Sequence, residues 1–196
     1  MFRLFVAVAA LMTSFASAQI PTQRAMELMA NTDVDTIRPV LRNAGLRPEE
    51  LDLEGHKTLA LREGGDTVLL RPRVCNPQCK GLLMFVVLEG SAPASAINAY
   101  NQRTPATVAY TNGNSTILSR YLIADHGITK GTFLANLEVF KQTVAVWTQN
   151  RSRNNALSVS LMSRAANAEA DPEMDAFIEE IARRPELLSG RISQEY

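Results

Sequence analysis

Two cysteines have the spacing that most directly suggests chemistry. Cys75 and Cys79 are separated by three residues, and they are the only cysteines among the 196 residues of the chain. In an oxidising compartment an even number of cysteines usually means a disulfide. A pair at this spacing could also help to bind a metal or act as reactive thiols. We predict a disulfide across a short turn and keep the other two uses as alternatives.

The remaining residues that could support catalysis do not form a recognisable group. A structural zinc site needs four ligands, but the two histidines, His56 and His126, each stand alone in the sequence. A nucleophile motif such as G-x-S-x-G is missing from the sequence. Arg71 and Arg73 share one side of an expected strand, which we interpret as a solvated sheet face. We therefore predict no catalytic residues, no metal site and no cofactor.

The N-terminus has the parts of a secretory signal peptide. Arg3 supplies the positive charge, an apolar run extends from Leu4 to Phe15, and Ala16-Ser17-Ala18 fits the A-x-A cleavage pattern. A membrane anchor is the alternative, but the run is shorter than the roughly 20 residues that cross a bilayer. We expect residues 1–18 to be removed and the mature protein, starting at Gln19, to be periplasmic or secreted. A lipid anchor would need a cysteine at that position.

Composition narrows the function classes. The chain has 20 basic and 20 acidic residues and a formal net charge of +0, so nothing in its charge attracts nucleic acid or an anionic membrane. Its hydrophobic content of 46% is enough for one good core. We expect one domain with a helical appendage, no nucleic-acid partner and no stable membrane insertion after cleavage.

Residues 33–150 are expected to form an α+β domain, preceded by a lead-in, residues 19–32, that is either a short helix or a frayed terminus. A helix capped by Asp33 or Asp35 should end near Gly45, with Pro39 delaying its start to about Thr36 or kinking it. Period-two patterns, turn residues and a fully apolar run then predict an antiparallel sheet of about five strands. These strands are 57–62, 67–74, 81–88, 107–111 and 116–123, with Asn112-Gly113 as the last turn.

Two helices complete the expected domain. The first should be capped by Ser91, stop at Thr104-Pro105 and place Ile97 and Tyr100 on one side. Its Asn98 and Asn101 should make capping and turn hydrogen bonds, with contact to a ligand as the alternative. The second begins after Thr129, and its large apolar residues recur every three or four positions. We interpret this stripe as the side that covers the sheet, with a ligand groove as the alternative; it comprises Phe133, Leu137, Phe140, Val144 and Trp147.

Residues 151–196 are predicted to be a helical C-terminal extension. Asp171-Pro172 is a helix start signal, and the apolar residues that follow have helical spacing before Arg183-Arg184-Pro185 ends the pattern. These residues are Met174, Phe177, Ile178 and Ile181. One interpretation is that this helix docks on the domain's own core. The other is that it binds a partner or dimerises.

The segment from Phe85 to Trp147 resembles the YbjN-domain family. The resemblance is carried by an apolar strand, the helix Ile97-Asn98-x-Tyr100-Asn101, a hairpin, the turn Asp125-His126-Gly127-Ile128-Thr129, and the closing helix. It covers roughly residues 33–150. The resemblance implies a fold similar to type III secretion chaperones, with a curved antiparallel sheet packed by helices and frequent dimers. It implies no catalytic residues.

Together these observations predict an exported, non-enzymatic, protein-binding domain with a chaperone-like or regulatory role. Its protein partner is unknown, and a homodimer is among the arrangements considered. Two alternatives stay open. One is a small-ligand sensor, and the other is an envelope enzyme of the hydrolase or thiol-redox type with an unrecognised site.

Overall fold

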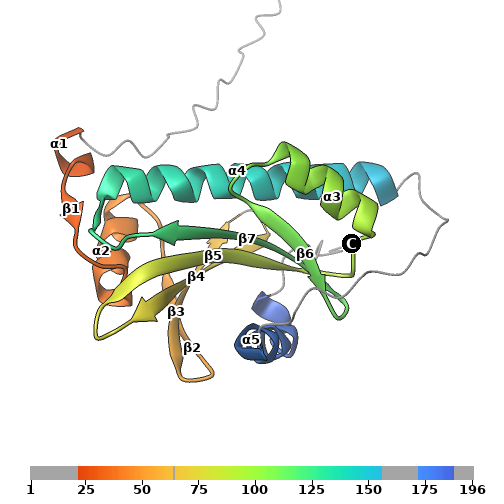
Figure 1. Ribbon diagram of the computed structural model, residues 1–196, viewed down its shortest axis with the longest axis horizontal. Coiled ribbons are helices and arrows are strands. Elements are labelled where there is room, and N and C mark those ends of the chain that lie inside the picture. The colour runs from red at the N-terminus through yellow and green to blue at the C-terminus, as the bar shows by residue number, and fades with distance from the viewer. Residues whose placement is uncertain (1–21, 64, 156–171, 188–196) are drawn as a thin grey trace, which may run out of the picture.

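The computed structural model describes residues 22–63, 65–155 and 172–187, and it contains a six-stranded antiparallel sheet with helices on both faces (Figure 1). The predicted signal peptide, residues 1–18, lies outside the described residues. The strand order is β2-β3-β4-β5-β7-β6, and every neighbouring pair is antiparallel. The strands are β2 (Glu49–Leu53), β3 (His56–Glu63), β4 (Asp66–Cys75), β5 (Cys79–Glu89), β6 (Val108–Asn112) and β7 (Ser115–Ile123). The predicted α+β class is confirmed.

The sheet has one strand more than the expected five. The additional strand, β2, is an edge strand that pairs with β3 across the two-residue turn Glu54-Gly55. Both turn residues have positive φ, 53° and 76°, as a type I′ hairpin turn requires. At the other end of the sheet, the β6–β7 turn is Gly113-Asn114, one residue later than predicted, because Asn112 pairs with Ser115.

A second, two-stranded sheet ties the N-terminal lead-in to the domain. It pairs β1 (Leu28–Met29), which follows the short helix α1 (Thr22–Ala25), with β8 (Ile128–Thr129). At Gly127, where φ is 80°, an added Cβ would lie 2.8 Å from the carbonyl oxygen of Met29. Only glycine permits this approach. The described part of the lead-in is therefore a packed segment rather than a frayed terminus.

Three helices lie against the first face of the sheet, on the side of α4 in Figure 1: α2 (Val34–Asn43), α3 (Ala94–Arg103) and α4 (Lys130–Asn155). All five residues of the α4 stripe are buried in the core beneath these helices, so the predicted covering role is confirmed. The expected cap is also present, since the hydroxyl of Thr129 accepts a hydrogen bond from the backbone N–H of Thr132 at 3.1 Å.

The helix starts agree only in part with the prediction. Helix α2 begins at Val34 with Asp33 at the N-cap position, one of the two caps expected, and Pro39 lies inside it without delaying its start to Thr36. The apolar stripe of α2 is buried against the sheet, and this packing offsets the backbone donor that Pro39 lacks. The N-cap of α3 is Pro93, not Ser91, and no side chain caps this helix.

Asn101 has a role that the sequence left open. Its side-chain amide donates to the carbonyl oxygen of Ala109 at 3.0 Å and accepts from the N–H of the same residue at 2.7 Å. Ala109 lies in β6, the strand at the edge of the sheet. Asn101 therefore satisfies backbone groups that an edge strand leaves open. These bonds join α3 to β6, whereas capping or turn hydrogen bonds were predicted for this residue.

The buried hydroxyl of Tyr100 should make the free energy of unfolding fall at alkaline pH. Its ring meets Trp147 edge-on at 5.0 Å, and burial raises the pKa of its hydroxyl above the ordinary value of 10.0. Above about pH 10 the unfolded chain therefore binds fewer protons than the folded chain, so stability falls as pH rises towards the folded pKa. Urea denaturation between about pH 9 and 11 should show this slope in the wild type and a smaller slope in Tyr100→Phe. Equal slopes would contradict the assignment.

Candidate functional site

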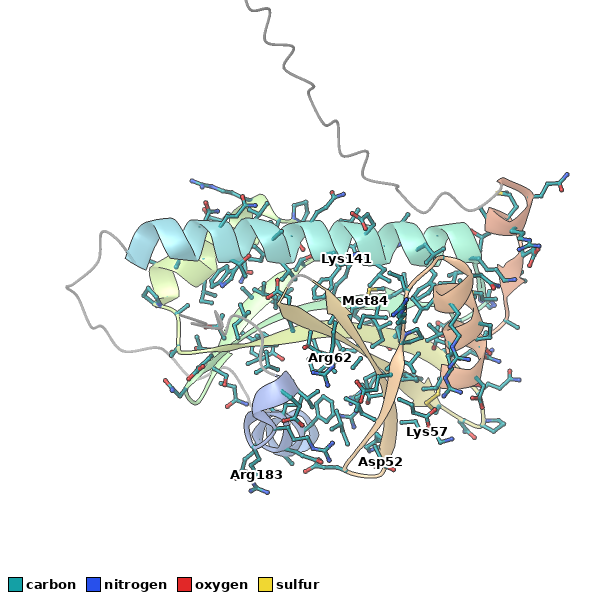
Figure 2. The ribbon with its side chains drawn as sticks, turned by 180° about the vertical axis from the view of Figure 1, so that it is seen from behind. Asp52, Lys57, Arg62, Met84, Lys141 and Arg183 are labelled. Carbon is teal, nitrogen blue, oxygen red and sulfur yellow. A yellow bond between two sulfur atoms is a disulfide. The ribbon has the colours of Figure 1, made fainter. Side chains whose placement is uncertain are left out.

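The second face of the sheet, opposite α4, carries the candidate site. Helix α5 (Pro172–Ala182) and the short 3-10 helix η1 (Pro185–Leu187) pack against it (Figure 1). Figure 2 shows Met84 on the side of α4 and Arg62 on the side of α5. A second hydrophobic core forms between α5, η1 and this face; it contains Leu53, Ala60, Leu69, Phe85, Val87, Ile117, Phe177, Ile178, Ile181 and Leu187.

Phe177 is the central side chain of this second core. It is fully buried, and its ring lies 5.2 Å from that of Phe85 in an edge-to-face arrangement. The guanidinium carbon of Arg71 lies 4.2 Å from the centroid of the Phe177 ring, which is the geometry of a cation–π contact. A large aromatic side chain of α5 is thus packed between an aromatic and a cationic side chain of the sheet. We call the part of the second face that α5 covers, around Leu69, Arg71 and Phe85, the groove.

Arg71 is the unexpected residue of the site. It is 1% exposed, and among the described residues it is the only charged side chain in the buried class. We interpreted it from the sequence as part of a solvated face, and this was wrong because α5 covers it. Its position on β4 places it on the same face as Leu69, two residues away. The first core, by contrast, is built from apolar side chains.

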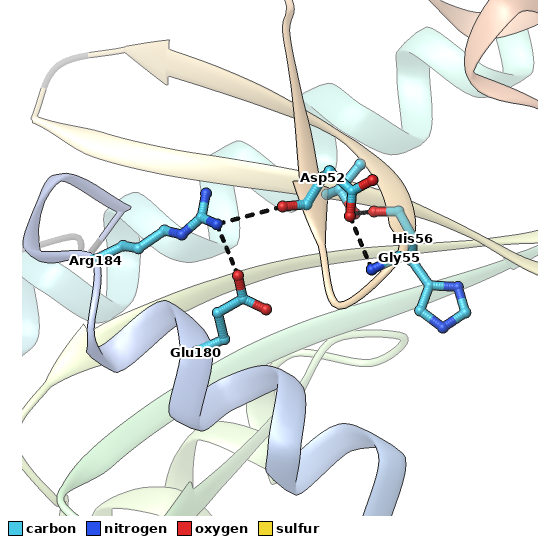
Figure 3. Close-up of polar contacts among 6 residues, drawn as sticks. Asp52, Gly55, His56, Glu180 and Arg184 are labelled. Carbon is cyan, nitrogen blue, oxygen red and sulfur yellow. Dashed lines mark hydrogen bonds and ion pairs between the residues drawn. The ribbon is translucent and has the colours of Figure 1, made fainter.

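Arginines also hold the C-terminal part of the docked segment. Arg62 donates to the carbonyl oxygen of Glu186 at 2.8 Å. Arg184 donates to the carbonyl oxygen of Asp52 at 3.4 Å and pairs with Glu180 at 2.7 Å (Figure 3). The Arg62 contact depends on the docked backbone alone, whereas the Arg184 contact uses a side chain of the docked segment and a carbonyl of β2.

Part of the second face remains open beside α5. The cross-strand pair Leu83 and Tyr121, and the pair Gly81 and Ile123, continue the face towards the β4–β5 turn. Tyr121 is 47% exposed and Ile123 is 66% exposed, whereas Leu83 is partly buried against the second core. The Tyr121 hydroxyl lies across Gly81, only 1.9 Å from where a Cβ would be. We call Leu83, Tyr121 and Ile123 the open strip.

The structure brings the two predicted disulfide residues together. The sulfur atoms of Cys75 and Cys79 lie 2.00 Å apart, at the end of the β4–β5 hairpin. The residues before α2 hold the same turn through Cys79. The carboxylate of Asp33 accepts a hydrogen bond from the N–H of Cys79 at 2.8 Å, and the N–H of Thr32 donates to the carbonyl oxygen of Cys79 at 2.9 Å. This use of Asp33 explains why its carboxylate does not cap α2.

Breaking this disulfide should have a moderate effect on stability. The bridge closes a loop of only a few residues, so its removal should lower the free energy of unfolding by about 1–3 kcal/mol. The measurement is urea denaturation of the wild type and of the Cys75→Ala/Cys79→Ala double variant, each with and without a reductant. The reductant should affect only the wild type. A wild type with two alkylatable thiols before reduction would contradict the bridge.

The other predicted residues are now placed. Phe177, Ile178 and Ile181 are buried against the chain's own sheet, which agrees with the first of the two interpretations of this helix. The side chain of Met174 lies outside the described residues, and partner binding by these four residues stays a prediction. Helix α4 continues through Asn155, past the expected domain boundary at residue 150.

The described residues contain neither a cluster of metal-binding side chains nor a membrane-spanning helix. Within ranges 22–63, 65–155 and 172–187, no three or more histidine, cysteine or acidic side chains gather in a way that could hold a metal ion. His126 and its neighbour Asp125 are exposed at the turn before β8. In the same ranges, no helix combines the length and the apolar character needed to cross a bilayer.

Comparison with known proteins identifies the fold. No family model and no curated protein matches the chain. Among solved structures, YbjN from E. coli, a proposed transcription regulator, superposes with a TM-score of 0.51 at 17% identity, over 66% of this chain and 96% of YbjN. The chain has a YbjN-like fold. An uncharacterized protein from Methanothermobacter thermautotrophicus is also similar, with a TM-score of 0.47 at 9% identity, over 61% of this chain and 96% of that one.

The YbjN-like fold confirms the resemblance found in the sequence. The residues that carried the resemblance have structural roles: Tyr100 packs on Trp147, Asn101 binds the β6 edge, and Gly127 lets β1 approach β8. Arg71 and the α5 groove were missed in the sequence. The available signal was a charged residue that follows Leu69 and Leu70 in a strand, together with a separate amphipathic helix that needed a surface to cover.

Proposed function

We propose that this protein is an exported, non-enzymatic domain that binds another protein in a chaperone-like or regulatory role. The observation that carries the proposal is the helix-binding groove on the second face of the sheet. Phe177 packs there between Phe85 and Arg71, and Arg62 of the sheet donates to a main-chain carbonyl of the docked segment. Grooves that accept the apolar side of an amphipathic helix are a common means of protein recognition.

Export is the second part of the proposal. It is supported by the arrangement of Arg3, the apolar run and Ala16-Ser17-Ala18 in the sequence. The cysteine pair at disulfide distance is consistent with an oxidising compartment. The test is cell fractionation with N-terminal sequencing of the mature protein. Recovery from the periplasm or medium with Gln19 as the first residue is expected, whereas a cytoplasmic protein that keeps residues 1–18 would overturn this part.

Protein binding is tested by capture followed by reconstitution. The full-length gene with a C-terminal affinity tag is expressed in its host, the cells are treated with a crosslinker, and captured proteins are identified by mass spectrometry. A candidate counts only if it saturates the purified chain at a fixed stoichiometry. An exported tagged protein of similar size serves as the matched control. If no candidate binds the purified chain, the protein-binding function is wrong.

A further inference from the structure

The groove on the second face is built in a way that another helix could reproduce. Phe177, Ile178 and Ile181 enter it as an aromatic and two aliphatic side chains with helical spacing. Arg62 of the sheet donates to a main-chain carbonyl of the docked segment, a contact that does not require a particular side chain there. A different helix with an aromatic residue and apolar residues one and four positions later presents the same apolar groups. It would need an arginine of its own to reproduce the contact between Arg184 and Asp52.

The α5 layer is the smaller of the two hydrophobic layers. Among the described residues, the second core contains ten buried residues, of which α5 and η1 contribute Phe177, Ile178, Ile181 and Leu187. The first core, beneath α2, α3 and α4, contains 21 buried residues of the same described ranges. Releasing α5 therefore exposes less apolar surface than opening the first core, so the α5 layer separates at the lower cost in free energy.

Charge also restricts the helix that fits. Between Pro172 and Ala182, α5 has four acidic residues and no basic residue. Glu179 and Glu180 pair with Arg183 and Arg184 directly after the helix, which leaves the two acidic residues of its first turn as the surplus negative charge. On the sheet side, Arg62, Arg71 and Arg73 lie at alternate positions of β3 and β4 that point to the second face. A helix with acidic residues beside its apolar stripe suits this surface, whereas a basic helix would be repelled.

The open strip offers additional apolar contacts to a partner helix that competes with α5. A tethered helix has a high effective concentration, commonly in the millimolar range for short flexible linkers, so a separate helix must make additional contacts to replace it. Leu83 joins the second core to Tyr121 and Ile123, which α5 leaves exposed. A partner segment that continues beside the helix can cover these residues and gain apolar burial that α5 does not have.

We propose that α5 is the intramolecular occupant of a helix-binding groove, and that it is replaced by an acidic amphipathic helix of a protein partner with an aromatic residue at the Phe177 position. The inference rests on the proposed protein-binding function and names the partner class and the means of competition. It also assigns a role to Tyr121 and Ile123, which would contact the partner outside the space that α5 fills.

The test uses the full chain and a fluorescein-labelled synthetic peptide with the sequence of residues 171–187. Binding is measured by fluorescence anisotropy to the wild type and to the Phe177→Ala chain. The variant should bind the peptide at least tenfold more tightly than the wild type, because its own α5 no longer competes. The same peptide carrying Phe177→Ala should bind at least tenfold more weakly, and raising the salt concentration should weaken binding of the native peptide.

Controls separate loss of α5 docking from loss of the fold. Trp147 lies on the opposite side of the sheet, so its fluorescence should be unchanged in Phe177→Ala. Ile178→Ala is a second variant that should release α5 to a smaller extent. Val139→Lys, on the outer side of α4, is the negative control, and the chain that carries it should bind the peptide as the wild type does. Equal peptide affinity for the wild type and both release variants would overturn the inference. So would a wild-type dimer that exchanges α5 between copies, since the occupant would then be a second chain.

The two proposals can fail separately. A captured and reconstituted partner whose affinity is unchanged by Phe177→Ala and by Tyr121→Lys would leave the protein-binding function in place and overturn the groove assignment. A partner that binds Phe177→Ala more tightly and Tyr121→Lys more weakly than the wild type would support both.

Discussion

Replacing Phe140 by alanine should lower the free energy of unfolding of the whole domain by about 3–5 kcal/mol. Phe140 is 0% exposed and lies in the middle of the α4 stripe, packed in the first core. Removing its ring forfeits apolar burial and leaves a cavity that the packed sheet cannot close completely. The loss should be global, because α4 covers the central strands and cannot leave without exposing them.

Urea denaturation followed by Trp147 fluorescence and by circular dichroism measures this effect, and the two transitions should coincide. Val139→Ala is the matched control, since Val139 is the preceding residue on the same helix and is 43% exposed. Its effect should lie within about 0.5 kcal/mol of zero. A Phe140→Ala effect as small as that of the control would mean that α4 does not cover the core.

The sequence predicted those elements in which local pattern and burial agree. The α4 stripe has the helical period, its cap Thr129 precedes it, and its side chains are the ones that are buried. Strand β5 was predicted because an apolar run between Gly81 and Gly90 suits a strand covered on both faces. In these segments the short-range preference of the sequence and the tertiary packing favour the same structure. The sequence pattern alone was therefore sufficient to predict it.

The missed elements are those in which packing decides against a local pattern. Strand β2 reads Glu-Glu-Leu-Asp-Leu, which suits a charged edge strand but has no strong strand preference of its own. Pro39 argued for a later start of α2, yet the buried stripe of that helix keeps it intact from Val34. An edge strand and a tolerated proline depend on neighbours that are distant in the sequence.

The candidate site was the least predictable part for the same reason. The apolar spacing of Phe177, Ile178 and Ile181 predicted a helix with a surface to bury, but it could not say which surface. Arg71 lies 106 residues before Phe177 in sequence numbering, and only the fold brings the cation to the ring. A strand with two arginines on one face looks solvated until the helix that covers it is known.

Replacing Phe177 by alanine should release α5 while the rest of the domain stays folded. Loss of a buried phenylalanine costs about 3–5 kcal/mol in a core that must remain closed. Here the cost is limited by the docking free energy of α5, because a helix that has left the sheet loses nothing further. The domain should therefore lose less stability than in Phe140→Ala, although both rings are 0% exposed.

Hydrogen exchange followed by mass spectrometry distinguishes local release from global loss. In Phe177→Ala the amides of α5 and η1 should exchange at rates close to those of an unfolded peptide, while β5 and α4 keep their protection. Arg183→Ala is the matched control, since it changes an exposed side chain on the same segment. If protection in β5 falls together with that of α5, the two cores unfold as one unit. The second face would then be a permanent core, and α5 would not be exchanged for the helix of a partner.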